Sequence, residues 1–138
     1  MAADPRIVDA FAKTDLFRGL ERRALERVAD TAKTVHHASG KSLTSEGQSG
    51  IGFHLILEGT AAVTVHGEER RTLKPGDYFG EISLIDGKPR SATVTAKENL
   101  TTASIVSWEF EPLLIEEPQI TKALLLVMCS RLRAAEKG

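Results

Sequence analysis

The sequence predicts a mainly β fold of the α+β class, in which a small antiparallel barrel or jelly roll is flanked by helices. Short apolar runs separated by glycines fill residues 34–106, and runs of this length and spacing are typical of a roll that protects its own strand edges. Apolar residues at helix-like spacing precede and follow this region. With 138 residues, the chain has the size of one domain with a substantial core.

Residues 1–33 are expected to form N-terminal helices. Ile7 and Phe11 lie one helical turn apart, and residues 21–32 are predicted to form an amphipathic helix with Leu25 and Val28 on one face. We expect these helices to pack as a cap on the core.

The β region is expected to span residues 34–107. Glycines at regular intervals mark turns or bulges between its short runs. The predicted strands are residues 41–44, 53–57, 61–66, 70–73, 92–95 and 100–106.

Residues 108–136 are expected to form two C-terminal helices. The first covers residues 108–116, and the second covers residues 118–136 with Pro118 in its first turn, where proline is tolerated. The apolar stripe of the second helix, which includes Ile120 and Leu124, is wider than one buried seam requires. We therefore expect one face to cover the barrel or a ligand, and the other to be available for a second subunit.

Composition argues against several functional classes. The formal net charge is −1, so no basic field favours nucleic acid as a partner of this chain alone. Cys129 is the only cysteine, which excludes an internal disulfide and fits a reducing compartment. The longest apolar run, residues 123–129, is far shorter than the roughly 20 residues needed to cross a bilayer. The N-terminus has no apolar signal core, so we expect a cytoplasmic protein without membrane contact.

The densest chemistry lies in residues 76–94. Glu81 can accept two hydrogen bonds from a diol, and Arg90 presents a planar fork of donors suited to a phosphate. Gly80 lets its backbone approach a ligand, and a helical turn beginning there would direct N–H groups at an anion. Ser91 adds a hydroxyl beside the arginine. Together these groups predict a ribose-phosphate ligand.

The same stretch resembles a known family. Residues 79–85 read FGEISLI and residues 89–94 read PRSATV, and in type, order and spacing they resemble the phosphate-binding cassette of cyclic nucleotide-binding domains. That family includes kinase regulatory subunits, cyclic-nucleotide-gated channels and bacterial cAMP receptor transcription factors. The resemblance implies an eight-stranded antiparallel jelly-roll β-barrel with N-terminal helices and two C-terminal helices, formed by residues 1–138 as a single domain with the cassette at residues 79–94.

The resemblance also implies ligand-binding roles. Glu81 would accept from the ribose 2′-hydroxyl, and Arg90 would pair with the exocyclic oxygens of the cyclic phosphate. The backbones of Gly80, Ile82 and Ser83 would contact ribose and phosphate, and the Ser91 hydroxyl would lie at the phosphate or the base.

The identity of the nucleotide and of the residue that covers its base follows less directly. Serine at position 91 favours cAMP, with cGMP as the alternative. In the family the base is capped from the C-terminal helix, which narrows the candidates to Met128, Arg131 and Leu132. We expect a non-catalytic sensor in which nucleotide favours a closed state with the C-terminal helix as lid. The downstream protein partner is unknown, and the sequence leaves open whether the chain is a whole regulator or the sensor domain of a longer one.

Two other functions were considered. A cupin-type metal enzyme would need clustered histidines, but His36 and His37 are adjacent and would point to opposite faces of a strand, whereas His54 and His66 lie on separate runs. All four histidines are expected at the surface or in turns, and we expect no metal site and no catalytic residue. The second alternative is a ligand-free interaction module that keeps the roll and docks a partner on its C-terminal helix.

Overall fold

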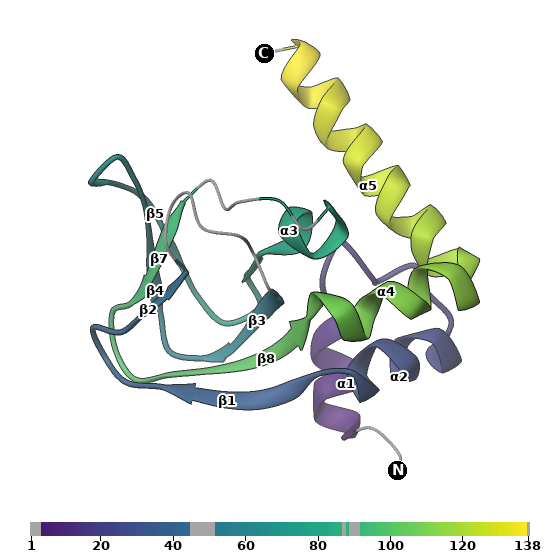
Figure 1. Ribbon diagram of the computed structural model, residues 1–138, viewed down its shortest axis with the longest axis horizontal. Helices are drawn as coiled ribbons and strands as arrows, with labels where there is room; N and C mark the ends of the chain where they lie inside the picture. The colour runs from purple at the N-terminus through teal and green to yellow at the C-terminus, as the bar shows by residue number, and fades with distance from the viewer. Residues whose placement is uncertain (1–3, 45–51, 87, 89–91, 138) are drawn as a thin grey trace. The chain divides into compact units, whose positions relative to one another are not determined.

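A computed structural model describes residues 4–44, 52–86, 88 and 92–137 (Figure 1). The chain divides into two compact units. One comprises Thr31–Phe110, and the other comprises Met1–Asp30 together with Glu111–Gly138. The first unit contains the β-structure and the second contains helices at both ends of the sequence, as the change in hydrophobic periodicity predicts.

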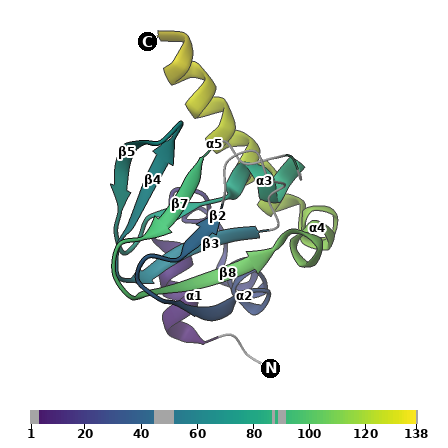
Figure 2. The same cartoon turned by 60° about the vertical axis from the view of Figure 1, so that its left-hand side comes forward.

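Eight strands lie in the described part of Thr31–Phe110, and they form two antiparallel four-stranded sheets (Figure 2). In the first sheet the strand order is β1 (Lys33–His37), β8 (Leu100–Val106), β3 (Gly52–Glu58) and β6 (Tyr78–Phe79). In the second sheet it is β2 (Ser42–Thr44), β7 (Thr93–Ala96), β4 (Ala61–Val65) and β5 (Glu68–Leu73). The predicted mainly β jelly roll is therefore confirmed, but across the described strands the ladder forms two separate sheets and not one closed barrel.

Two of these strands, β1 and β6, lie outside the six predicted runs. β1 is an edge strand in which only His37 is buried, so it lacks the apolar signal of a strand interior. β6 has two residues, which is too short to show any alternation.

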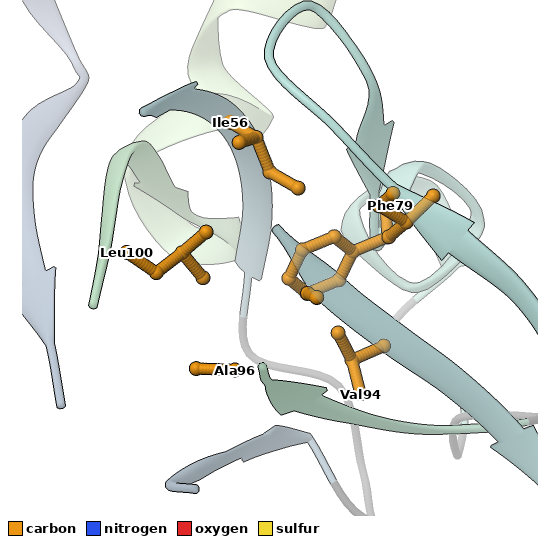
Figure 3. Close-up of a cluster of buried hydrophobic side chains, with 7 residues drawn as sticks. Ile56, Phe79, Val94, Ala96 and Leu100 are labelled. Carbon is orange, nitrogen blue, oxygen red and sulfur yellow. The ribbon is translucent and has the colours of Figure 1, made fainter. Parts of the chain in front are cut away.

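Apolar side chains from both sheets fill the space between them. Figure 3 shows Ile56, Phe79 and Leu100 of the first sheet converging with Val94 and Ala96 of the second. Burial of this apolar surface is the main source of stability for the roll. We call this set the apolar cluster; its buried members are Ile56, Ala61, Leu73, Phe79, Val94, Ala96 and Leu100.

The N-terminal helices are α1 (Pro5–Ala12) and α2 (Arg22–Asp30). The Asp4 side chain caps α1 by accepting from the Arg6 N–H at 2.9 Å, and Pro5 occupies its first turn. Phe11 and Phe17 are fully buried with their rings edge to face, 5.7 Å apart between centroids. Leu25 and Val28 are buried on α2, as the helical spacing predicts.

The C-terminal helices are α4 (Ser107–Glu116) and α5 (Pro118–Lys137), close to their predicted bounds. On α5, Ile120 and Leu124 are buried, whereas Leu125 and Leu132 are 59% and 63% exposed. No helix in the part of the chain that the structure describes has the length and apolar character of a membrane span.

Candidate functional site

The chain enters the cassette through a tight turn at Lys74–Asp77. The Asp77 N–H donates to the Lys74 carbonyl at 2.9 Å, and Gly76 has a φ of 96°. With Pro75 before it, this glycine forms the turn type that requires a positive φ at its third residue. The Asp77 carboxylate accepts from the Lys74 N–H at 2.9 Å, so side chain and backbone both close the turn.

The turn is fastened to strand β3. The Gly76 N–H donates to the Ile56 carbonyl, and the Ile56 N–H donates to the Asp77 carbonyl, both at 2.9 Å. Strand β6 then pairs with β3, with Tyr78 opposite Leu55 and Phe79 opposite His54. The two residues before Gly80 therefore have their backbone position set by the first sheet.

Aromatic contacts hold β6 on both faces of that sheet. Tyr78 stacks on Phe53 with 5.4 Å between ring centroids, and Phe79 stacks on His54 with 4.9 Å between centroids. Because successive residues of a strand point to opposite faces, these two stacked pairs hold β6 against β3 on both faces of the sheet. Gly80 is the first residue after these stacked pairs.

Gly80 and the short helix α3 (Glu81–Asp86) follow directly. Gly80 has a φ of 90°, which a residue with a Cβ adopts only at a cost, so the chain turns here because the residue is glycine. The Gly80 carbonyl accepts from the Leu84 N–H at 2.9 Å, which closes the first helical turn. Leu84 is buried and anchors the helix, whereas Ile82 and Ile85 are exposed.

Four of the predicted ligand-binding residues are thus contiguous at the start of α3. Glu81 is the first residue of the helix and is half-buried, and the backbone N–H groups of Ile82 and Ser83 precede the first intrahelical hydrogen bond. Such N–H groups are suited to contact an anion or a sugar oxygen. Arg90 and Ser91 lie outside the described residues.

The candidate base-capping residues all lie on α5. Met128 and Arg131 are half-buried and Leu132 is exposed. They belong to the helical unit, whereas the cassette belongs to Thr31–Phe110. Which of the three covers a base stays a prediction.

The histidines differ from their predicted surface positions. His36 and His37 point to opposite faces of β1 as expected, but His37 is buried and His54 is half-buried, so that prediction is wrong for these two. In the described part of the chain, no group of three or more His, Cys, Asp or Glu side chains is placed to hold a metal ion.

Both inward-facing histidines belong to a chain of hydrogen bonds that the sequence did not reveal. The distances are 3.0 Å from His37 Nε2 to Thr102 Oγ1, 2.8 Å from Thr102 Oγ1 to Ser104 Oγ, and 2.6 Å from Ser104 Oγ to His54 Nδ1. We call these four side chains the polar row. The alternation of Thr102 and Ser104 with apolar Ala103 and Ile105 was the available signal, because it indicates a polar stripe on one face of β8.

A second missed cluster joins α2 to the break between α4 and α5. The Glu117 carboxylate accepts from Arg23 at 2.9 and 3.0 Å and from Arg27 at 2.8 Å, and Arg27 also donates to Glu116 at 2.7 Å. Hydrogen bonds from Arg23, and then from Arg27, lower the pKa of Glu117. The two arginines therefore fix the residue that immediately precedes α5.

Comparison with known proteins identifies the family. The sequence profile of the cyclic nucleotide-binding domain matches residues 34–117, which is more than half of the chain. A cAMP-dependent protein kinase regulatory subunit of Yarrowia lipolytica is 41% identical over 90 residues, covering 64% of this chain and 24% of that protein. The chain spans about a quarter of the length of the curated relatives it matches.

Solved structures share the fold. The N-terminal domain of a transcriptional regulator from Streptomyces coelicolor superposes with a TM-score of 0.84 at 25% identity and covers 94% of both chains. The regulatory domain of Toxoplasma gondii PKA, crystallised with cAMP, has a TM-score of 0.78 at 24% identity over 93% of this chain and 49% of the other. From the cassette, the jelly roll and the profile match together, the chain belongs to the cyclic nucleotide-binding domain family.

Proposed function

We propose that residues 1–138 act as a single, non-catalytic sensor domain that binds cAMP. The observation that carries this proposal is the geometry at Gly80, where a φ of 90° turns the chain from a clamped strand into α3 and leaves Glu81 at the start of the helix. Family membership supplies the ligand class. A cytoplasmic location remains a prediction from the sequence.

In this proposal Glu81 accepts a hydrogen bond from the ribose 2′-hydroxyl. The backbones of Gly80, Ile82 and Ser83 contact ribose and phosphate. Arg90 and Ser91, which lie outside the described residues, complete the site, with the guanidinium on the exocyclic oxygens and the hydroxyl at the phosphate or base.

We favour cAMP over cGMP for two reasons. Serine and not threonine follows Arg90, and the sequence relative named above is a cAMP-dependent protein kinase regulatory subunit. A domain of the same fold was crystallised with cAMP. A kinase catalytic subunit is accordingly one candidate for the downstream partner.

The output of the sensor is proposed to pass through α5, which acts as a lid. Nucleotide would favour the state in which Met128, Arg131 or Leu132 covers the base, so that binding shifts the population toward closure. Glu117, held by Arg23 and Arg27, is placed to set where α5 begins. Hydrogen exchange that is equally fast in residues 118–136 with and without cAMP would exclude the lid.

Calorimetric titration with cAMP and cGMP tests the proposal directly. Arg90→Ala should weaken cAMP binding by roughly 2–5 kcal/mol, because it removes charge-assisted bonds to the phosphate. Glu81→Ala should cost less, about 1–3 kcal/mol, because its partner is a neutral hydroxyl. Arg18→Ala and Glu98→Ala, which remove exposed charges of the same types outside the cassette, serve as matched controls. A larger loss for Glu81→Ala than for Arg90→Ala would reverse the assigned roles.

A ligand-free interaction module is the second candidate, and exposed leucines on α5 favour it. Leu125, Leu126 and Leu132 are each about three-fifths exposed, which suits a contact with a partner protein or with α5 of a second copy. If neither nucleotide releases heat or raises the melting temperature, this candidate replaces the sensor. Sedimentation of wild type and of Leu126→Ala would then test for a homodimer.

A further inference from the structure

The polar row extends from an edge of the first sheet across three of its four strands. His37 lies on β1, Thr102 and Ser104 on β8, and His54 on β3, and the strand order β1-β8-β3-β6 makes these neighbours. The row ends at β3, where the His54 ring stacks on Phe79 of the next strand, β6, at an interplanar angle of 28°. Phe79 is the residue directly before Gly80.

The donor at the His37 end of the row follows from the surroundings of its second ring nitrogen. His37 Nδ1 is buried and has no hydrogen-bond partner among the described residues. An N–H group buried without an acceptor is rarer in proteins than an unpaired acceptor, so the proton of His37 belongs on Nε2. Nε2 then donates to Thr102 Oγ1. Each of the two hydroxyls can donate or accept in the next two hydrogen bonds, Thr102 to Ser104 and Ser104 to His54.

At the other end of the row, the Ser104 hydroxyl holds His54. His54 Nδ1 lies 2.6 Å from Ser104 Oγ, within hydrogen-bond distance whichever of the two atoms donates. This hydrogen bond fixes the rotation of the imidazole, and therefore the plane on which the Phe79 ring lies. Without this hydrogen bond the stacked ring would still contact Phe79, but its orientation would not be fixed.

We propose that His54 is a positioning residue for the cassette. Ser104 orients His54, His54 orients Phe79, and Phe79 sets where the chain enters the positive-φ turn at Gly80. The ligand-binding consequence rests on the proposed function, because it is the Gly80 backbone and the Glu81 side chain that the nucleotide would contact. The structural consequence does not need a ligand.

Ser104→Ala tests the proposal, with Thr101→Ala as the matched control. Thr101 lies on the same strand but on the opposite face, where its hydroxyl pairs with exposed His36 at 3.1 Å. In the unligated protein, Ser104→Ala should shift the amide resonances of Phe79, Gly80 and Glu81 and change the imidazole ¹⁵N shifts of His54. Thr101→Ala should change neither. Ser104→Thr, which restores a hydroxyl, should return both sets of shifts toward wild type.

The second measurement is the affinity for cAMP. Loss of one orienting hydrogen bond should weaken binding about fivefold in Ser104→Ala and leave Thr101→Ala unchanged. His54→Phe, which keeps a stacked ring without the hydrogen bond, should weaken binding to a similar degree.

The outcomes separate the two proposals. Unchanged amide shifts at residues 79–81 in both Ser104→Ala and His54→Phe would overturn the role of His54, as would equal shifts in Thr101→Ala. If wild type binds no cAMP, the proposed function fails, while the amide and imidazole shifts still decide whether His54 positions the cassette.

Discussion

On β3 and β8 the apolar cluster and the polar row lie on the same face, yet they stabilise the roll by different means. On β3, Ile56 of the cluster is two residues from His54 of the row, and on β8 Leu100 is two residues from Thr102. The cluster gains free energy from every buried group, without regard to direction. The row gains little net free energy but restricts orientation, because each buried polar group must have its partner.

The largest change in the free energy of unfolding is expected in the apolar cluster. Leu73→Ala removes a fully buried side chain of the apolar cluster and should lower the free energy of unfolding by about 2–5 kcal/mol. Leu126→Ala, at a position that is 60% exposed, should change it by no more than about 0.5 kcal/mol. Urea denaturation of both variants measures the difference. Similar midpoints for the two would mean that the cluster does not carry the stability of the roll.

The sequence predicted the features of the roll that depend on local apolar patterns and turn residues. Alternating apolar residues bounded by glycines indicate a strand from local sequence alone. A proline followed by a glycine likewise indicates a turn, as at Lys74–Asp77. The need for glycine at position 80 was also predicted, and the φ of 90° gives it a conformational reason beyond close approach of a ligand. These features depend on residues close together in the sequence.

The polar row could not be predicted from the sequence, because its hydrogen bonds depend on which strands pair. His37 and Thr102 are 65 positions apart, and Arg23 and Glu117 are 94 apart. A histidine next to polar neighbours in an edge strand looks exposed until the pairing of β1 with β8 places it beside a buried threonine. The roles of Arg90 and Ser91 stay predictions, since both lie outside the described residues.

An intermediate effect is expected at the centre of the polar row. Thr102→Val keeps the shape of a fully buried side chain but removes the hydroxyl that joins His37 to Ser104. The free energy of unfolding should fall by about 1–3 kcal/mol, because buried His37 and half-buried Ser104 both lose a partner. Thr101→Val, which loses only an exposed hydrogen bond, should cost under about 0.5 kcal/mol. If Thr102→Val were as stable as wild type, the row would be neutral and its members replaceable by apolar residues.

The smallest effect is a dependence of stability on pH that only the polar row should show. Burial lowers the pKa of His37 from its ordinary value of 6.5, with further contributions from the positive charges of Lys41 and of protonated His36. The unfolded chain therefore binds the proton more readily than the folded one, so the stability from neutral His37 is complete above about pH 6.5 and falls as the pH drops below it.

Urea midpoints at pH 7.5 and 5.5 measure this dependence. Wild type should lose more stability between the two values than His37→Gln, which cannot titrate. His36→Gln at the exposed neighbouring position should keep most of the wild-type loss, because burial and not the charge of His36 is the main cause of the lowered pKa of His37. Leu73→Ala, despite its larger overall cost, should also keep it, because the apolar cluster contains no titrating group. An identical loss in wild type and His37→Gln would mean that His37 titrates as it does in the unfolded chain. The polar row would then differ from the apolar cluster only in restricting the orientation of its side chains.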